Sequence, residues 1–353
     1  MKAWESNIRK VEPYVPGEQP KVQDVIKLNT NENPYGPSEN VRKAMEAIDI
    51  DRCRLYPDPD VTKLVKSIAD YYGMDNNQVF VGVGSDDVLS MCFLTFFNGK
   101  KPVLFPDITY SFYSVWADLY RIPYECQKLD EDFKLVKEDY YKENGGVIFP
   151  NPNAPTGIYE DLSVVEDIIA HNQDVIVIVD EAYIDFAGRS ALEMIDKYDN
   201  LIVVQTFSKA RSMAGMRIGY AISNPTLIKY LNDAKYSFNS YTMNQTSIVC
   251  GVEAVKDREY FENGVRKIVE TREWAKEELT KLGFTYLDSG SNFIFAKHPE
   301  YDAKELFEAL KAHDIYVRFW GSERIEQYMR ITIGTREEME QLFAFLRICV
   351  AGF

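Results

Sequence analysis

Three short apolar runs are the feature that most constrains how this chain can fold. They occupy residues 146–149, 175–179 and 201–204. Each is rich in β-branched or aromatic residues, as is typical of a strand buried on both faces of a sheet. The runs alternate with stretches that carry helix-start and helix-stop signals. This alternation predicts an α/β fold in which helices cover both faces of a mainly parallel sheet.

Polar residues follow directly after each of these runs. Asp180 and Tyr183 come after the second run, and Lys209 comes after the third. The first run leads into Pro-Asn-Pro-Asn-Ala-Pro-Thr-Gly at residues 150–157. Open α/β sheets bind ligands beyond the carboxyl ends of their strands, which lie at one edge. The sequence therefore predicts that these polar groups meet in one ligand site.

Lys209 is the most reactive group that this pattern places at the strand ends. It lies in a segment of mostly small residues, 206–220, that also contains Arg217. Partial burial and a neighbouring cation both lower the pKa of a lysine amine toward the range in which it is a nucleophile. The segment alone leaves two interpretations open, a Schiff-base lysine and an ordinary lysine in a strand-to-helix loop.

Composition narrows the class of protein. The chain has 353 residues, 46% of them hydrophobic, which is enough for one large core and a smaller domain. Its net charge is −15 and it has no block of Lys and Arg, so we expect neither nucleic acid nor an anionic membrane as a partner. No P-loop, zinc-hydrolase or serine-hydrolase motif occurs.

The cysteines and histidines predict neither disulfide bonds nor a metal site. The five cysteines are odd in number and scattered without a Cys-x-x-Cys pair, so we expect core residues in a reducing cytoplasm. None of the three histidines has a partner at metal-ligand spacing, and we expect no metal site. The first residues lack an apolar signal segment, and no stretch approaches transmembrane length. The prediction is a cytoplasmic soluble protein.

The chain divides into three predicted parts. Residues 1–36 are rich in Pro, Asn and Glu and suggest an extended arm. Residues 37–245 hold the alternating strands and helices of a large domain. Residues 246–353 form a smaller α/β domain. It begins with a long charged helical stretch, about residues 243–282, and contains two further strands near residues 293 and 330.

Three motifs together resemble one enzyme family. They are Asn-Pro-Asn-x-Pro-Thr-Gly at 151–157, Asp-Glu-Ala-Tyr at 180–183, and Thr-x-Ser-Lys at 206–209 with Arg217 eight positions after the lysine. Their order and spacing are similar to those of the pyridoxal-phosphate aminotransferases of the aspartate-aminotransferase fold, and most similar to the histidinol-phosphate aminotransferases. The likeness continues through residues 28–34 and 329–335 and so covers essentially the whole chain.

The resemblance implies an enzyme with pyridoxal 5′-phosphate as cofactor. Such an enzyme needs a lysine for the aldehyde, an acid for the ring nitrogen and a donor for the phenolate oxygen. Lys209 would bind the aldehyde and shuttle the proton between the substrate Cα and C4′ of the cofactor. Asp180 would pair with the ring nitrogen, and its alternative is a helix cap. Tyr183 would donate to the phenolate oxygen, and its alternative is an aromatic residue packed under the sheet.

The cofactor phosphate needs several donors, and the sequence offers a set of them. Residues 81–87 join a strand to a helix whose first N–H groups can hold an anion, which makes Ser85 and Asp86 candidates. Ser208 and Arg217 would add a hydroxyl and a guanidinium.

Two tyrosines match further positions of the family. Tyr110 matches the residue whose ring stacks on the cofactor, and as a bare residue it fits the core equally well. Tyr56 matches the residue that reaches the cofactor phosphate of the neighbouring subunit, although a tyrosine in a turn before proline is the alternative. The resemblance thus implies a homodimer with shared active sites, in which the arm packs with the small domain and the partner subunit.

One position departs from the family pattern. Asparagine usually stands directly before Pro-Thr-Gly and donates to the phenolate oxygen, whereas this chain has Ala154 there. Either the neighbouring Asn153 supplies the amide through a shifted loop, or Tyr183 is the only donor. We expect Asn153.

The resemblance also suggests the substrate. Arg330 matches the arginine that binds a carboxylate in related aminotransferases and the substrate phosphate in histidinol-phosphate enzymes. Tyr14, Asn33 and Arg318 are the further candidates for substrate contacts. Two cations near one site suit a dianionic phosphate.

The predicted reaction is amino transfer between L-histidinol phosphate and 2-oxoglutarate in histidine biosynthesis. Three alternatives stay open. An aromatic amino-acid aminotransferase would use the same arginine on a carboxylate, and a threonine-phosphate decarboxylase would share the phosphate site but release CO₂. A regulatory or scaffold protein that binds the cofactor is the non-enzyme alternative.

Overall fold

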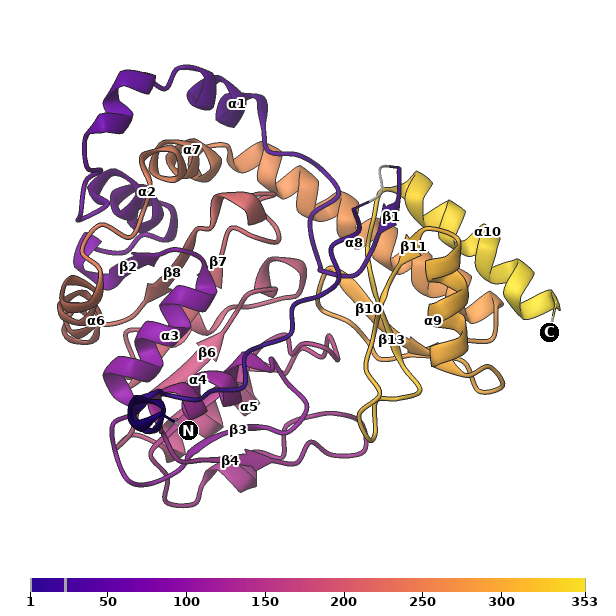
Figure 1. Cartoon of the computed structure of the whole chain (residues 1–353), viewed down its shortest axis with the longest axis horizontal. Coiled ribbons are helices and arrows are strands. Elements are labelled where there is room, and N and C mark those ends of the chain that lie inside the picture. Colours follow the sequence, from indigo (N-terminus) through magenta and orange to yellow (C-terminus); the bar gives the residue numbers. More distant parts are fainter. Residues whose placement is uncertain (1, 22–23, 353) are drawn as a thin grey trace.

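The computed structural model describes residues 2–21 and 24–352. Its larger body holds a seven-stranded sheet and its smaller body a four-stranded one. The long helix α8, Arg258–Lys281, runs from the larger body along the smaller one, as Figure 1 shows. The α/β fold with a mainly parallel sheet and a smaller C-terminal α/β domain is confirmed.

The large sheet has the strand order β2-β8-β7-β6-β5-β3-β4. β8 is antiparallel to both of its neighbours, and the pairs from β7 to β4 are parallel. The strands are β2 (Val79–Gly82), β3 (Val103–Pro106), β4 (Tyr124–Gln127), β5 (Gly146–Pro150), β6 (Val177–Asp180), β7 (Leu201–Thr206) and β8 (Gly219–Ile222). The three apolar runs are therefore strands, as their composition predicted, and they are neighbours in the sheet.

Side chains alternate across these strands and build one core on each face of the sheet. Val147 and Val177 pack on the side of α1, α2, α5 and α7, whereas Ile148 and Ile178 pack on the side of α3, α4 and α6. The helices of this body are α1 (Glu39–Glu46), α2 (Thr62–Tyr72), α3 (Ser85–Phe96), α4 (Phe112–Tyr120), α5 (Leu162–His171), α6 (Pro225–Phe238) and α7 (Gln245–Lys256).

The small body combines an antiparallel sheet with three helices. Its strand order is β12-β13-β10-β9, and α8, α9 and α10 pack against it. The remaining elements are β9 (Thr285–Tyr286), β10 (Phe293–Lys297), β12 (Arg318–Phe319), β13 (Met329–Thr332), α9 (Ala303–Ala312) and α10 (Arg336–Gly352).

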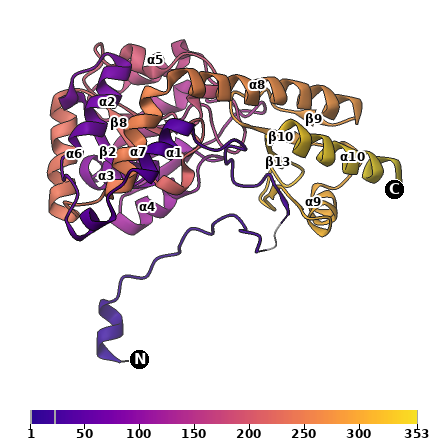
Figure 2. The same cartoon turned by 90° about the horizontal axis from the view of Figure 1, so that it is seen from above.

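The N-terminal segment crosses between the bodies. Its strand β1 (Ile26–Lys27) pairs in parallel with β11 (Ile315–Tyr316) of the small body. Before β1 the chain runs away from the small domain, and the first residues project from the body in Figure 2. Glu18 of the arm pairs with Lys311 of α9 at 2.7 Å, so the arm also contacts the small domain of its own chain before β1.

The structure differs from the sequence predictions at three points. The expected helix over residues 243–282 is two helices that meet at Asp257, and α7 packs on α1 and α2, so the larger body extends past the predicted boundary at 245. The antiparallel β8 was not expected. Cys53 and Cys126 are exposed, whereas Cys92, Cys250 and Cys349 are buried as predicted.

A helix that crosses a bilayer needs about 20 consecutive, mostly apolar residues. Within the described part of the chain, no helix combines the length and the apolar character needed to cross a membrane.

Candidate active site

Two adjoining cavities lie beyond the carboxyl ends of the parallel strands. The inner cavity, about 190 Å³, is lined mainly by the large domain, and the outer cavity, about 330 Å³, lies between the two domains and the N-terminal segment. Both lie at the edge where an α/β sheet of this kind binds ligands. Five residues line both cavities and mark their junction: Thr30, Tyr110, Ala154, Tyr183 and Lys209.

Lys209 stands at the junction of the two cavities. Its Nζ donates to the backbone oxygen of Thr30 at 3.1 Å and lies 5.8 Å from the centre of the Tyr183 ring. The amide of Asn33 donates to the backbone oxygens of Lys209 and Ala210, at 3.0 and 3.2 Å. The N-terminal segment thus holds the lysine loop in place from the side opposite β7.

Asp180 ends strand β6 and lines the inner cavity. Its Oδ2 accepts a hydrogen bond from the Tyr113 hydroxyl at 2.8 Å, and its Oδ1 accepts one from the Ala182 N–H at 3.2 Å. Burial raises the pKa of this carboxyl to about 6, although both hydrogen bonds oppose the shift. The result is a buried acid with further acceptor sites for a cationic group in the cavity.

The Tyr183 hydroxyl is oriented by Asn31. Its oxygen accepts a hydrogen bond from the Asn31 amide at 2.8 Å. A hydroxyl carries one proton of its own, so Tyr183 can still donate to a ligand. Asn31 in turn shares hydrogen bonds with Thr332 of β13, which ties the tyrosine to the small domain.

Cationic and backbone donors gather at one end of the inner cavity. Arg217 contacts Asp86 Oδ2 at 3.1 Å and Ser208 Oγ at 3.4 Å, and Ser85 opens α3 beside it. A Cβ on Gly84, whose φ is +88°, would lie 2.4 Å from the Arg217 guanidinium, so the close approach requires glycine. The first N–H groups of a helix attract anions, and the arrangement suits a phosphate.

The inner cavity therefore fits pyridoxal 5′-phosphate on the chemistry of its donors. Lys209 offers the amine, Asp180 the acid and Tyr183 the phenolic donor, while Arg217 and Ser208 stand at the phosphate end. Tyr110 lines the same cavity, and its hydroxyl donates to Asp86 at 2.7 Å.

The outer cavity contains two arginines that lie side by side. Arg318 of β12 and Arg330 of β13 are register partners in adjacent antiparallel strands, so their side chains share one face. The Trp320 ring lies 5.3 Å from the Arg318 guanidinium and 5.1 Å from that of Arg330. Like charges in this position repel each other unless an anion lies between them.

Arg330 is half-buried as a whole, but its Nε lies fully inside the protein. Burial lowers the pKa of its guanidinium to about 10, and the charge of Arg318 acts in the same direction. One terminal nitrogen donates to the backbone oxygen of Asn29 at 2.9 Å, whereas Nε is buried and has no partner among residues 2–21 and 24–352. Tyr14 lines the same cavity and stacks on Phe112, with ring centres 4.2 Å apart.

Two predicted residues have other partners than expected. The Asn153 amide donates to the Ile108 backbone oxygen at 2.9 Å and to Thr156 at 3.0 Å, and its oxygen accepts from Thr109. The loop is not shifted, and Ala154 rather than Asn153 lines the cavities. The expectation that Asn153 replaces the missing amide is wrong because the loop consumes its hydrogen-bonding groups.

Asn33 is the second such residue. It supports the backbone at Lys209 and does not line the outer cavity, so the expected substrate contact is corrected to a structural one.

Tyr56 lies away from both cavities of its own chain. Its side chain is 81% exposed and stacks on Tyr241 with ring centres 4.6 Å apart. The described chain alone therefore does not bring Tyr56 to the site.

Sequence reasoning missed several residues that shape the site. Tyr113 carries no local signal, because its partner Asp180 lies 67 residues away. Trp320 lies close in sequence to its partner Arg318, but no motif marks it. Asn31 stands in the quoted motif at residues 28–34, where only Asn33 was predicted to belong to the site, and it donates to the Tyr183 hydroxyl.

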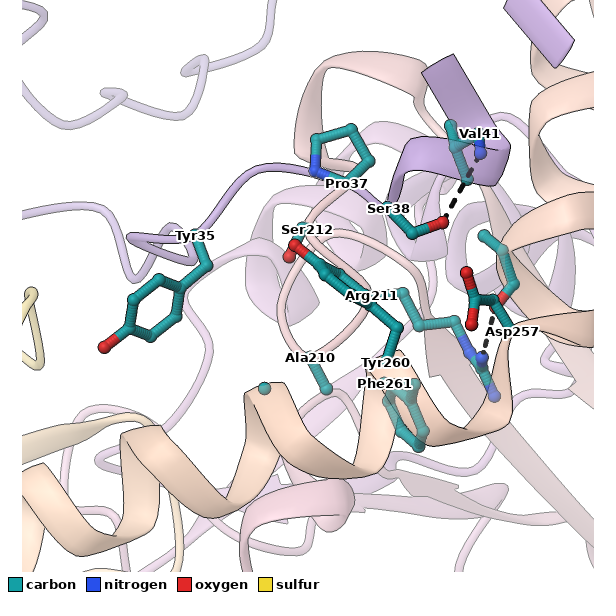
Figure 3. Close-up of a pocket in the computed structure, with 12 residues that line it drawn as sticks. Tyr35, Pro37, Ser38, Val41, Ala210, Arg211, Ser212, Asp257, Tyr260 and Phe261 are labelled. Atoms are coloured by element: carbon teal, nitrogen blue, oxygen red, sulfur yellow. Dashed lines mark hydrogen bonds between the residues drawn. The ribbon is translucent and has the colours of Figure 1, made fainter. Parts of the chain in front are cut away.

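A third and much smaller cavity lies on the other side of the lysine loop (Figure 3). Its volume of about 20 Å³ has room for about one water molecule. Arg211 lies along it, donates to the Ala254 backbone oxygen at 3.0 Å and packs 4.1 Å from the centre of the Phe261 ring. The role of Arg211 is therefore structural.

Comparison with known proteins gives one family. Residues 23–346 match the family described as "Aminotransferase class I and II". Histidinol-phosphate aminotransferase of Lactococcus lactis subsp. cremoris (strain SK11) is 50% identical over 345 residues, which are 98% of this chain and 97% of the relative. The enzyme of that name from Clostridium beijerinckii is 49% identical over 351 residues, covering 99% and 98%.

A solved structure agrees in fold. Histidinol-phosphate aminotransferase from Sinorhizobium meliloti, in complex with pyridoxal-5′-phosphate, superposes with a TM-score of 0.84 at 23% identity, over 92% of this chain and 91% of that one.

Proposed function

The chain belongs to the class I and II aminotransferases, and from this premise we propose that it exchanges an amino group between L-histidinol phosphate and 2-oxoglutarate. The cofactor is pyridoxal 5′-phosphate, on which this family depends. The reaction would serve histidine biosynthesis. Relatives that are about 50% identical over nearly the whole chain carry the name of this activity.

The substrate assignment depends on the two neighbouring arginines of the outer cavity. Arg318 and Arg330 lie on one face of adjacent strands, and Arg330 has a buried donor without a partner among the described residues. A phosphate dianion would supply two charges and several acceptor oxygens to these groups. Tyr14 lines the same cavity and offers a hydroxyl. Lys209, where the two cavities join, would then face the amino-bearing carbon of the substrate.

The residues of the inner cavity divide the chemical work. The bound cofactor supplies an aldehyde for the amine and a ring that accepts electrons. Asp180 would hold the positive charge of the ring nitrogen, and Tyr183 would donate to the phenolate oxygen. Lys209 would take the proton from the substrate Cα and return it to C4′ of the cofactor. Ser85, Asp86, Ser208 and Arg217 would hold the phosphate end.

The alternative enzymes predict different products. An aromatic amino acid offers only a carboxylate to the two arginines, and a decarboxylase would release CO₂ without an oxo acid. We expect the purified chain to have a higher kcat/KM with histidinol phosphate than with phenylalanine. We also expect no CO₂ from threonine phosphate. A preference for phenylalanine, or CO₂ release, would reject the assignment.

A homodimer is part of the proposal. Ile50, Tyr56 and Phe238 are 76%, 81% and 70% exposed, and Tyr56 stacks on Tyr241 at the same end of the body. Large exposed apolar groups of this kind mark an interaction surface. A second copy would cover them and bring its Tyr56 to the cofactor phosphate of the first.

Light scattering after gel filtration tests the dimer. We expect twice the chain mass for the wild type and a lower mass for Phe238→Glu. Ile348→Glu is the matched control, since Ile348 is 68% exposed on α10 at the far end of the small domain. A wild-type chain that elutes as a monomer would contradict the shared active site.

A cytoplasmic location completes the proposal. Cys53 and Cys126 are exposed free thiols, and a reducing compartment keeps such thiols unpaired.

A further inference from the structure

Tyr113 makes a contact with the active-site acid that no motif indicates. It lies in the first turn of α4, is fully buried, and donates its hydroxyl to Asp180 Oδ2 at 2.8 Å. Its ring packs against Phe93, Phe105 and Trp116. These contacts fix the ring, so the position of its hydroxyl is also fixed relative to β6.

We propose that Tyr113 is a positioning residue for Asp180: its buried hydroxyl holds the carboxylate in the orientation and charge state that the cofactor ring nitrogen requires. The inference rests on the proposed function only through the cofactor, and it does not depend on which amino donor the enzyme uses.

The hydrogen-bonding capacity of the carboxylate supports this role. An ionised carboxylate has about four acceptor sites. Tyr113 occupies one on Oδ2 and the Ala182 N–H occupies one on Oδ1. Two donors on different oxygens restrict rotation about χ2, a torsion that is otherwise broad for aspartate. The remaining acceptor sites are available to the inner cavity, which Asp180 lines.

The same hydrogen bond favours the charged form of the acid. Burial raises the pKa of Asp180, and the bond from Tyr113 lowers it, while the charge of Asp86 on α3 raises it further. Burial and the charge of Asp180 raise the pKa of Tyr113 well above its ordinary value, so the hydroxyl keeps its proton and remains a donor. Lys209 and Arg217 also line the inner cavity, and a change at Tyr113 leaves both in place.

The chain offers a matched pair of substitutions. Tyr113→Phe removes the hydroxyl and keeps the ring. Tyr140→Phe does the same at another fully buried tyrosine, whose hydroxyl has no partner in the part of the chain that the structure describes. Any effect of losing a buried hydroxyl as such appears in both variants, whereas an effect through Asp180 appears only in the first.

The measurement is the Kd for pyridoxal 5′-phosphate, obtained by titrating the full-length protein after the cofactor has been removed, from about pH 5.5 to about pH 8.5. For Tyr113→Phe we expect a Kd roughly tenfold above that of Tyr140→Phe near pH 6, or about 1.4 kcal/mol. The ratio should shrink as pH rises, because at high pH the carboxyl is ionised in both proteins and only the orientation effect remains.

A second background tests whether Tyr113 acts through Asp180. With Asp180→Asn already present, adding Tyr113→Phe should change the Kd less than twofold, since no charged carboxylate remains to be held. An equal loss in both backgrounds would assign Tyr113 a purely structural role and overturn the inference. So would a Kd that matches the Tyr140→Phe value at every pH. A wild-type chain that binds the cofactor but does not use histidinol phosphate would reject the proposed function instead.

Discussion

The inner and outer cavities share a lysine but are built in different ways. The inner cavity takes most of its groups from residues that directly follow strands β6 and β7 or open α3. The outer cavity is assembled from the N-terminal segment, the loops after β3 and β5, and β12 and β13 of the small domain.

The two cavities also differ in how their polar groups are satisfied. In the inner cavity Asp180 accepts two hydrogen bonds and Arg217 contacts both Asp86 and Ser208. At the outer cavity the buried Arg330 Nε and Asn29 Oδ1 have no partner in the part of the chain that the structure describes. Buried polar groups are normally paired, so those of the outer cavity point to a ligand that completes them. The chain thus pairs the polar groups of the inner cavity by itself, whereas those of the outer cavity are left for a ligand to pair.

Lys209 belongs to both cavities, and its removal should have the largest effect. We expect Lys209→Ala to lower kcat by at least about 10⁴-fold, because no other amine lines both cavities within the described residues. Cofactor binding should persist, since the phosphate end is unchanged. Steady-state assays with histidinol phosphate and a cofactor titration measure the two effects.

Lys66→Ala is the control for that experiment. Lys66 is exposed on α2 and pairs with Asp70 at 2.8 Å, far from the cavities. Its kcat should equal that of the wild type. A Lys209→Ala variant that retains more than a hundredth of the wild-type rate would show that the proton is moved by another group.

Substitution of Arg330 tests whether the unpaired polar groups of the outer cavity bind the substrate. We expect Arg330→Leu to lower kcat/KM for histidinol phosphate by roughly 10²- to 10³-fold, because the substrate phosphate loses a buried charged partner. The same change should raise the Tm of the ligand-free protein, since it removes a buried cation that lacks a full set of partners. Enzyme kinetics and thermal unfolding measure the two opposite effects.

The matched control is the neighbouring Arg318. Arg318→Leu should lower kcat/KM less and should leave the Tm of the ligand-free protein nearly unchanged, because among the described residues Arg318 has no buried side-chain nitrogen that lacks a partner. If Arg330→Leu lost activity and Tm together, the arginine would be a structural residue rather than one that waits for an anion.

These expectations also show what the sequence could predict. Lys209, Asp180 and Tyr183 were found because an apolar run and the polar residues after it are neighbours in the chain, and a parallel sheet brings such ends together. Tyr113 and Asn31 were missed because they are 67 and 152 residues from the groups that they contact. Nothing local distinguishes Tyr113 from the other 22 of the 23 tyrosines.

The wrong prediction for Asn153 has a similar cause. Its neighbours in the sequence suggest a free amide beside the cavity. The groups that engage it come from Ile108 and Thr109 on another loop, as well as from its own turn. Hydrogen bonds between distant loops leave no periodic trace in a sequence.

Two adjacent acids at the end of β6 make the stability of the protein depend on pH, and one of them belongs to the inner cavity. Burial raises the pKa of Asp180 to about 6 and that of Glu181 to about 7, above their ordinary values of 3.8 and 4.5. At pH values between the ordinary and the raised pKa of each acid, the folded state binds more protons than the unfolded state. These two acids should therefore add about 4 kcal/mol to the free energy of unfolding of the ligand-free protein as pH falls from about 8 to about 5.

Only one of these acids faces the inner cavity. Glu181 accepts hydrogen bonds from Ser190, the Ala191 N–H and Gln205 on the other side of the strand end. Bound cofactor should favour the charged form of Asp180 and leave Glu181 unaffected, so it should reduce the rise in stability without abolishing it. Urea unfolding at several pH values, with and without cofactor, measures this. A slope that the cofactor does not change would contradict the pairing of Asp180 with the ring nitrogen.

Asn153 provides the smallest expected effect on the cofactor. Its amide is engaged by Ile108 and Thr156, and Ala154 stands at the cavity wall. We expect Asn153→Ala to lower the free energy of unfolding by about 1–3 kcal/mol, because buried partners lose their hydrogen bonds. The pH titration of the cofactor absorbance in the holoenzyme should be unchanged. The contrasting variant is Ala154→Asn, which places an amide at the position that lines both cavities and should shift that titration to lower pH, since a donor to the phenolate oxygen stabilises its charged form. A shift in Asn153→Ala and none in Ala154→Asn would show that the loop rearranges when the cofactor binds and that Asn153 does reach it.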